Sequence, residues 1–394
     1  MSEKISLKII IIIASLVAVG PMATDMYLPA LPTMSKDFNT SSANVQLTLS
    51  IYFFGFAIGQ LIYGPLSDRF GRKPVLQMGL LIFIISSAIA SLATSIETLI
   101  FMRLMQALGG CAGPVLGRAM VRDMFSAEEA GQVLSHVAST MALAPAIAPI
   151  IGGILTVNFG WQANFWFLFA YAIAAFLMLS FGLAETNHHK NPDAMKLNLM
   201  LSNYIQIIKH REWRLYTLIC SLIFAGLFAF LSASSFVLIE YFHVSELQYG
   251  LLFAVIVIGY IIGSQVSARL SRRIGGFSLI RMGCWLGLIA GLSMLGLNLL
   301  GIYHISSIII PHFFYMIAVG ITMPLAMAGA LAPFPKMAGA ASGLLGTTQM
   351  LIAAGFGVII GQWNTGTPLV LSAGIAAAGV SAFLMMKRLK FSIK

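Results

Sequence analysis

The feature that most constrains this chain is a series of long apolar stretches separated by short polar ones. A stretch of about 18 apolar residues is long enough to cross the hydrocarbon core of a bilayer as a helix. Twelve such stretches follow one another along the 394 residues. Their approximate ranges are 6–31, 43–66, 74–94, 98–119, 130–156, 162–183, 213–239, 246–268, 277–299, 306–332, 338–360 and 366–387. We therefore predict an all-α integral membrane protein with twelve transmembrane helices.

The composition leaves no room for a large aqueous domain. Apolar residues make up 59% of the chain and charged residues only 9%, whereas a soluble domain averages about 25% charged residues. The mean hydropathy is +0.91. The first stretch is too long for a cleaved signal peptide, and no small-x-small site follows it. We expect the chain to be surrounded by the lipid bilayer.

The basic residues predict the orientation of the spans. If both termini are cytoplasmic, 20 of the 23 lysines and arginines face the cytoplasm. Lys36 faces out, and Arg103 and Arg118 fall within a span. Short loops with this bias follow the positive-inside rule, so the net charge of +10 is a topology signal and does not indicate nucleic acid. The cysteines, Cys111, Cys220 and Cys284, lie in spans and predict neither a disulfide nor a metal site.

The chain divides into two similar halves. The polar segment "ETNHHKNPDAMKLN" (185–198) has six spans on each side, so we expect a bundle at 1–184, a cytoplasmic linker at 185–212 and a bundle at 213–394. "GQLIYGPLSDRFGR" from Gly59 and "GSQVSARLSRRIGG" from Gly263 are offset by 204 residues. Five aligned positions are identical: those of Gly59, Leu66, Ser67, Arg69 and Gly71. Two pseudo-symmetric six-helix bundles form a transporter architecture, with the site between them.

One loop carries more than positive charge. In "GPLSDRFGRKP" (64–74), glycines and prolines suit a sharp turn between two spans. Asp68, however, stands among Arg69, Arg72 and Lys73. It is either part of a solvated turn or part of a latch between the halves. In the latch it pairs with these bases or caps the N-terminus of the eleventh span, near Met337.

These residues resemble motifs of the major facilitator superfamily. The inner-loop motif is matched by Gly64, Asp68, Arg69, Gly71, Arg72 and Lys73. "LIFMRLMQALGG" (99–110) resembles the fourth-span motif through Arg103 and Gln106, with Ala107 where a glycine is usual. "APAIAPIIGG" (144–153) resembles the fifth-span antiporter motif through Pro149, Gly152 and Gly153, with Ala148 in place of a glycine. Together with "DMYLPALP" and "QLTLS", the chain is similar to the bicyclomycin-resistance (Bcr/CflA) group.

The resemblance implies the major facilitator fold and a proton-coupled drug exporter that works by alternating access. It also implies a multi-pass protein of the bacterial inner membrane. We expect it to act as a monomer on small amphipathic compounds and protons, without a cofactor. The inner loop, Asp123 and the fifth-span residues Pro149, Gly152 and Gly153 would carry the conformational switch.

Asp25 is the one carboxylate that lies inside a span. A charge at the bilayer centre costs roughly 2.5–3.5 kcal/mol, so such residues face the interior and pair. Arg103 is expected at a comparable depth. Burial favours the neutral form of a carboxylate and a nearby arginine favours the charged form, so moving the arginine or admitting a cation can bind or release a proton. Asp25 is therefore the leading proton site, with Arg103 as its electrostatic control. The alternatives are a structural Asp25 at the outer mouth and a structural Arg103 that binds backbone carbonyls.

An apolar cavity lined by aromatic and methionine side chains would hold the substrate. The candidates are spread over five spans: Thr24, Asp25, Tyr52, Phe53, Met141, Phe224, Phe228, Ser232 and Gln349. Most aromatic residues of a membrane protein serve packing instead.

Two other functions are compatible with part of the pattern. A metabolite, amino acid or siderophore exporter would share the fold and mechanism. A membrane enzyme would need a constellation of catalytic residues at one face, and the candidates, such as His136 and Asp123, are scattered. The chain has no phosphate-binding loop sequence, so ATP is not expected to drive it directly.

Overall fold

The computed structural model describes residues 7–188, 190–192, 194–363 and 367–390, and within these ranges its regular elements are all helices, joined by short turns and loops. Up to residue 184 the elements are α1 (Leu7–Asp25), η1 (Leu28–Ala30), α2 (Leu31–Asp37), α3 (Ser42–Phe70), α4 (Arg72–Ser91), α5 (Ile96–Gly110), α6 (Ala112–Met124), α7 (Ala127–Phe159) and α8 (Gln162–Gly182). They are followed by α9 (Leu197–Lys209), α10 (Arg211–Ser235), η2 (Phe236–Tyr241), α11 (Glu246–Ile274), α12 (Gly276–Leu299), α13 (Ser306–Leu331), η3 (Pro335–Met337), α14 (Ala338–Gln362) and α15 (Pro368–Lys390).

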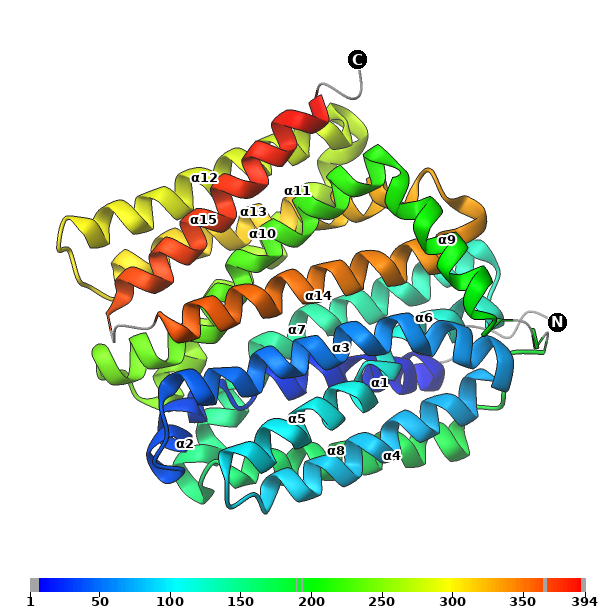
Figure 1. Ribbon diagram of the computed structural model, residues 1–394, viewed down its shortest axis with the longest axis horizontal. Coiled ribbons are helices and arrows are strands. Elements are labelled where there is room, and N and C mark those ends of the chain that lie inside the picture. Colours follow the sequence, from blue (N-terminus) through cyan, green and yellow to red (C-terminus); the bar gives the residue numbers. More distant parts are fainter. Residues whose placement is uncertain (1–6, 189, 193, 364–366, 391–394) are drawn as a thin grey trace.

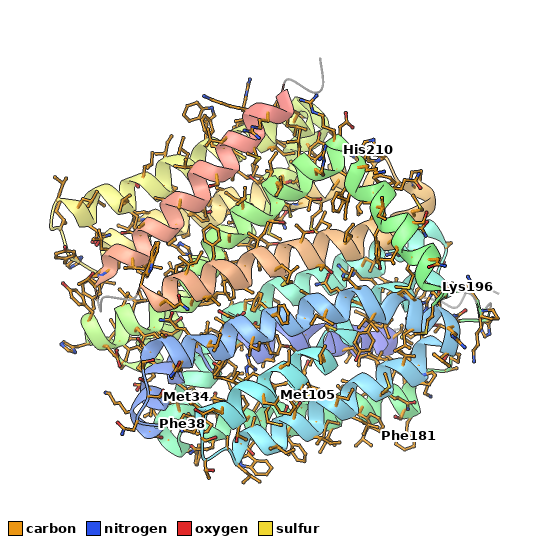
Figure 2. The ribbon with its side chains drawn as sticks, viewed as in Figure 1. Met34, Phe38, Met105, Phe181, Lys196 and His210 are labelled. Atoms are coloured by element: carbon orange, nitrogen blue, oxygen red, sulfur yellow. The ribbon has the colours of Figure 1, made fainter. Side chains whose placement is uncertain are left out.

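The helices are long enough for a membrane protein. Eleven helical segments in the described part of the chain are long and apolar enough to cross a bilayer. The expected fifth span lies in the 33-residue helix α7, of which the segment Leu143–Phe159 is an apolar helix among the described residues. Large apolar side chains cover the outer surface, and Phe181 is 85% exposed (Figure 2). This outward apolar surface is what lipid contact requires.

The helices fall into two groups that meet along two seams. α1 to α8 lie on one side and α10 to α15 on the other, with α3 beside α14 in the middle (Figure 1). The second seam joins α7 to α11. At the end of the molecule where α2 lies, η1 also contacts α10 and α11. We call this the α2 end, and the opposite end, where α9 lies, the α9 end.

The internal repeat is visible in the helix boundaries. α3 and α11 begin and end at positions offset by the same 204 residues. Each helix starts after a serine whose side chain caps it, Ser41 or Ser245. Each is followed by a glycine with positive φ, 109° at Gly71 and 81° at Gly275. Only glycine adopts this conformation without strain, which explains why both copies retain it.

One local expectation was wrong. Gly64 and Pro65 do not form the turn: both lie inside α3, and the turn before α4 is made by Gly71 alone. The segment between the helix groups also contains a helix that was not predicted. This helix, α9, buries Ile207, and its Tyr204 Oη donates a hydrogen bond to the Leu61 carbonyl at 3.4 Å. Its apolar residues recur at helical spacing, which a reading by polar content overlooks.

Candidate functional site

Asp25 is buried at the end of α1. The residue is only 5% exposed. Its carboxylate accepts a hydrogen bond from Thr24 Oγ1 at 2.9 Å. Asp25 therefore lies in the interior rather than at an exposed mouth.

Arg103 is fully buried in α5 and held by rings. Its guanidinium carbon is 4.3 Å from the ring centroid of Tyr27 and 4.3 Å from that of Tyr52. A guanidinium between two aromatic faces gains cation–π attraction, which strengthens when water is excluded. Its Nε and Nη2 atoms have no hydrogen-bond partner among the described residues. The rings thus replace part of the hydration that this cation loses.

The fourth-span motif fixes Arg103 from the other side. Arg103 Nη1 donates to Gln106 Oε1, and Gln106 Nε2 donates to Ser87 Oγ of α4 at 2.8 Å. Ser87 in turn donates to the Phe83 carbonyl at 2.6 Å. This chain of bonds explains why a glutamine stands three residues after the arginine, one helical turn along.

The expected direct pairing of Asp25 with Arg103 is not formed. Among the described residues, the ion pairs both belong to Arg72. Each buried charge instead has its own neutral partners: Thr24 for Asp25, and Gln106 with the tyrosine rings for Arg103. Tyr52 belongs to the partners of Arg103.

Three of the expected pocket aromatics meet across the two halves. The ring centroid of Phe53 on α3 is 4.3 Å from the ring centroid of Phe228 and 6.3 Å from that of Phe224, both on α10. Ser232 lies one turn beyond Phe228, and its Oγ is buried without a hydrogen-bond partner. The rings therefore pack against each other in this conformation and join the helix groups.

The remaining pocket candidates are placed less closely. Gln349 is buried on α14, and its Nε2 contacts Met323 Sδ at 4.0 Å; no contact joins it to the phenylalanines in the described structure. The side chain of Met141 lies outside the described residues. Thr24 and Tyr52 belong to the surroundings of Asp25 and Arg103.

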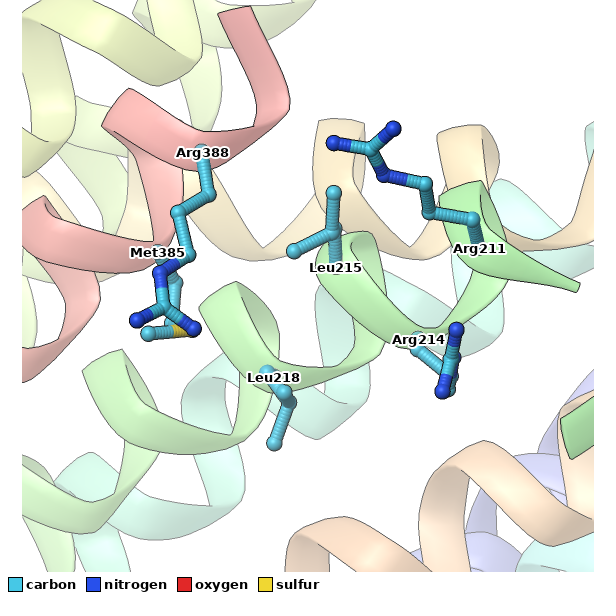
Figure 3. A pocket seen from close by; sticks show the side chains of 6 residues that line it. All are labelled: Arg211, Arg214, Leu215, Leu218, Met385 and Arg388. Carbon is cyan, nitrogen blue, oxygen red and sulfur yellow. The ribbon is translucent and has the colours of Figure 1, made fainter. Parts of the chain in front are cut away.

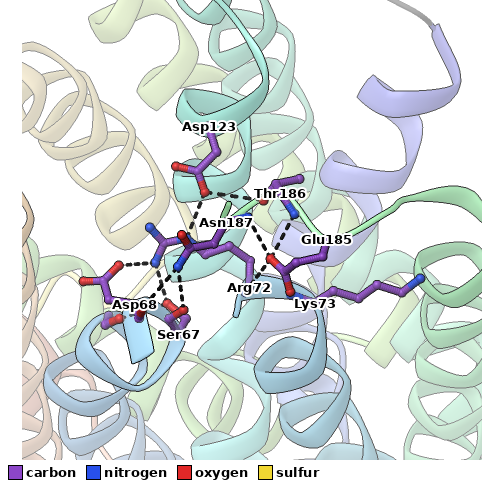
Figure 4. A network of polar contacts seen from close by, with 9 residues as sticks. Ser67, Asp68, Arg72, Lys73, Asp123, Glu185, Thr186 and Asn187 are labelled. Atoms are coloured by element: carbon purple, nitrogen blue, oxygen red, sulfur yellow. Dashed lines mark hydrogen bonds and ion pairs between the residues drawn. The ribbon is translucent and has the colours of Figure 1, made fainter. Parts of the chain in front are cut away.

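The inner-loop motif forms a network around Arg72 (Figure 4). Its guanidinium binds Asp68 at 2.5 Å and Asp123, at the end of α6, at 2.9 Å. It also donates to Ser67 Oγ at 2.7 Å. The Arg72 side chain is only 13% exposed, so the network is partly shielded from water. Arg69 is exposed and stacks over the Phe70 ring, outside this network.

Sequence reasoning missed Glu185. Its carboxylate accepts hydrogen bonds from the backbone N–H groups of Arg72, at 2.9 Å, and Lys73, at 3.1 Å. It thereby caps the start of α4, where Gly71 has no side chain to do so. Lys73 Nζ makes the reverse contact, donating to the carbonyls of Ser180 and Leu183 at the end of α8. No local spacing links residues so far apart in the chain.

The expected contact between Asp68 and the start of α14 is not formed in this conformation. Asp68 is bound to Arg72, and Met337, which precedes α14, provides no side-chain cap. The carbonyl of Asp68 accepts bonds from Asn187 Nδ2 and the Asn191 N–H. The network therefore lies within the first helix group and the segment that follows it.

The glycine pair of α7 allows two backbones to approach. A Cβ atom on Gly152 would overlap the carbonyl of Met26, just after α1. A Cβ atom on Gly153 would lie 2.6 Å from the carbonyl of Glu246, at the start of α11. Pro149 is buried in the same helix, and its carbonyl lies near Gly250 of α11. α7 thus packs against both helix groups at the α2 end.

A duplicated helical fold with an intramembrane carboxylate and arginine in its interior defines a secondary transporter. The Major Facilitator Superfamily sequence model matches residues 13–358. The chain belongs to this superfamily.

Its relatives agree with the resemblance drawn from the motifs. The chain is 29% identical to a bicyclomycin resistance protein homolog of Haemophilus influenzae, over 90% of this chain and 89% of that one. It is 31% identical to the uncharacterized MFS-type transporter YdgK of Bacillus subtilis, over 89% and 87%. Among solved structures, a D-xylose-proton symporter matches 97% of this chain and 96% of its own, with a TM-score of 0.77 at 14% identity. The last match supports the fold alone.

Proposed function

We propose that this chain is a proton-coupled exporter of small amphipathic compounds, located in a bacterial inner membrane. The observation that carries the proton coupling is the burial of Asp25 and Arg103 without an ion pair between them. A carboxylate in a low-dielectric interior is neutral or charged according to what approaches it. A cationic or strongly polar substrate, or entering water, would change that balance and release or bind a proton.

The choice of cargo rests on the relatives and on the aromatic interior. Relatives carry the names bicyclomycin resistance protein homolog, multidrug resistance protein D and chloramphenicol resistance protein. Phe53, Phe224 and Phe228 offer apolar faces at the junction of the helix groups. An aromatic wall with few fixed polar groups suits varied amphipathic molecules.

Residues 1–184 and 213–394 act in this proposal as two bundles joined by the linker 185–212, with both termini in the cytoplasm and the protein working as a monomer. The α9 end then faces the cytoplasm, in agreement with the distribution of lysine and arginine. The conformation described has its aromatic seam closed, and α7 packs on α1 and α11 at the α2 end. Opening that end would require α7 and α11 to separate at Gly153 and Gly250.

The test measures the resistance that the protein gives to a panel of compounds, beginning with bicyclomycin and chloramphenicol, in a strain that lacks its own drug pumps. Compounds to which the protein gives resistance are then loaded into proteoliposomes with a transmembrane pH gradient. We expect export that a protonophore abolishes. Resistance without any dependence of transport on the gradient would overturn the proton coupling, and a panel with no positive compound would overturn the drug cargo.

A further inference from the structure

A basic pocket lies between α10 and α15 at the α9 end of the molecule. Its volume is about 390 Å³, and its lining combines three arginines with three apolar side chains: Arg211, Arg214, Leu215, Leu218, Met385 and Arg388 (Figure 3). These residues are far from Asp25, Arg103 and the aromatic seam in the sequence, and the proposed transport mechanism does not use them.

The lining of the pocket carries three positive charges and no negative one. Arg211, Arg214 and Arg388 are all exposed, and none forms an ion pair with another described residue, because both such pairs belong to Arg72. The six lining residues include no carboxylate. Three guanidinium groups around one pocket repel one another, and an anion between them would relieve that repulsion.

Charge and apolarity follow one another along both helices. α10 begins at Arg211, and Leu215 and Leu218 follow Arg211 and Arg214 by four residues each, about one turn of 5.4 Å. α15 ends just after Arg388, and Met385 precedes that arginine by three residues. Each helix therefore places arginine at its end and an apolar side chain one turn further in.

This order matches the order of groups in a lipid. α10 and α15 both belong to helices long and apolar enough to span a bilayer, so their ends at this side lie at headgroup depth. A guanidinium presents a planar fork of donors that fits phosphate oxygens. Basic pockets between transmembrane helices on the cytoplasmic side bind anionic headgroups in this way.

We propose that this pocket binds an anionic phospholipid: its phosphate lies among Arg211, Arg214 and Arg388, and its acyl chains follow Leu215, Leu218 and Met385. The arginines supply the charge selectivity and the apolar residues require an attached chain. Inorganic phosphate shares the headgroup chemistry but cannot use the apolar part. A zwitterionic lipid shares the chain but brings no net charge.

The test is native mass spectrometry of the full-length protein, purified in detergent and titrated with phosphatidylglycerol, phosphatidylcholine or inorganic phosphate. The test variant carries Arg211→Gln, Arg214→Gln and Arg388→Gln. The matched control carries Arg269→Gln, Arg272→Gln and Arg273→Gln, three exposed arginines near the end of α11. We expect tight phosphatidylglycerol binding that weakens about fivefold per arginine removed in the test variant, with the control close to wild type.

Equal losses in the test and control variants would overturn the pocket, because they would indicate a general attraction to positive charge. Binding of phosphatidylcholine as tight as that of phosphatidylglycerol would overturn the charge selectivity. Displacement of the lipid by inorganic phosphate at equal concentration would mark a free-anion site and overturn the lipid assignment. If the triple variant does not fold, the single variant Arg388→Gln decides the same question. Its expected effect is about a fivefold weakening of phosphatidylglycerol binding.

Discussion

Asp25 and Arg103 are charged residues that the interior tolerates by different means. Asp25 has one hydrogen bond, from Thr24, which leaves most of its oxygen acceptor capacity free. Arg103 lies between the rings of Tyr27 and Tyr52 and binds Gln106. Asp25 can change its charge by taking a proton, whereas an arginine keeps its charge. The two residues therefore have different parts in the proposed mechanism.

Replacement of Asp25 by asparagine should abolish substrate-induced proton release while the protein still inserts and folds. Asparagine keeps the shape and the contact with Thr24 but has no proton to exchange. The measurement is proton release from detergent-purified protein on addition of a transported compound. Asp37→Asn is the matched control, because Asp37 is exposed at the end of α2 and accepts a bond from Trp161. Release equal to wild type in Asp25→Asn would end its assignment as the proton site.

Replacement of Arg103 by lysine should not preserve transport. Lysine keeps the charge but loses the planar group that stacks between two rings and reaches Gln106. Each ring contact is worth about 0.5–2 kcal/mol in a desolvated site, so we expect transport to fall at least about tenfold at equal expression. The comparison is with Arg103→Ala. Wild-type transport by the lysine variant would reduce Arg103 to a point charge, and wild-type transport by the alanine variant would remove it from the mechanism.

The sequence was sufficient to find these two residues but not their partners. A charge inside an apolar stretch stands out because burying it is costly, and the Arg103–Gln106 spacing is one helical turn. The ring sandwich combines Tyr27, after α1, with Tyr52 of α3, and no periodicity in the chain associates them. A direct Asp25–Arg103 pair was the simplest expectation from depth alone, whereas in the structure Arg103 contacts the rings of Tyr27 and Tyr52.

At the scale of helices, α4 and α8 are fastened at their facing ends. Glu185 caps the first N–H groups of α4, and Lys73 binds the last carbonyls of α8. Each charge lies at the helix end whose partial charge it complements. The sequence could predict the repeated helix ends, because serine caps and turn glycines recur after 204 residues. It could not predict the role of Glu185, which bonds to residues more than a hundred positions away. Nor did it predict α9, because polar segments surround it.

Glu185→Gln should destabilise the protein by about 0.5–2 kcal/mol, the usual worth of a helix cap. The amide has one acceptor oxygen and no charge, so it cannot serve Arg72 and Lys73 N–H groups equally. Thermal unfolding in detergent is the measurement. Glu97→Gln is the control, because Glu97 is exposed in the first turn of α5. An unchanged midpoint in Glu185→Gln would show that backbone and water satisfy α4 without it.

Gly152→Ala should impair transport strongly, although it adds a single methyl group. The methyl would overlap the carbonyl of Met26, and backbone cannot move aside as a flexible side chain can. Gly355→Ala on α14 is the control, because nothing lies within 4 Å of its added Cβ and alanine favours a helix. We expect the control to equal wild type in resistance and in melting temperature. Normal resistance in Gly152→Ala would show that α7 and α1 do not need this close approach.

At the scale of the whole molecule, the two helix groups are duplicated but not equivalent. The first copy of the repeated loop carries Asp68, and the aligned position of the second copy carries Arg272. Asp68, Arg72 and Asp123 form an ion-pair network in the first group, and the described part of the second group has no ion pair. In this conformation the network does not cap α14. A contact that is absent in one conformation and formed in another is what a switch requires.

Asp68→Asn should therefore shift the population of conformations toward the one open at the α9 end. In our proposal the carboxylate meets the start of α14 when the α9 end is closed, where free N–H groups carry partial positive charge. Such a contact is worth about 0.3–2 kcal/mol, which shifts two populations between about twofold and thirtyfold without locking either. Turnover should fall, and drug affinity of the form open at the α9 end should stay nearly unchanged.

The measurement is a distribution of spin-label distances between Pro74 and Ala332, two exposed positions on opposite helix groups at the α9 end. Cys111, Cys220 and Cys284 are buried, so cysteines introduced at the two label sites are the accessible ones. Asp123→Asn is the comparison variant, because it removes the ion pair between Arg72 and Asp123 but keeps the Asp68 carboxylate. It therefore separates the local bonding of Arg72 from the proposed contact of Asp68 with α14. A longer mean distance in Asp68→Asn than in Asp123→Asn would support the latch on α14. If Asp68→Asn left the distances unchanged, Asp68 would serve only the local bond to Arg72, and the switch would have to lie in α7 and its glycines.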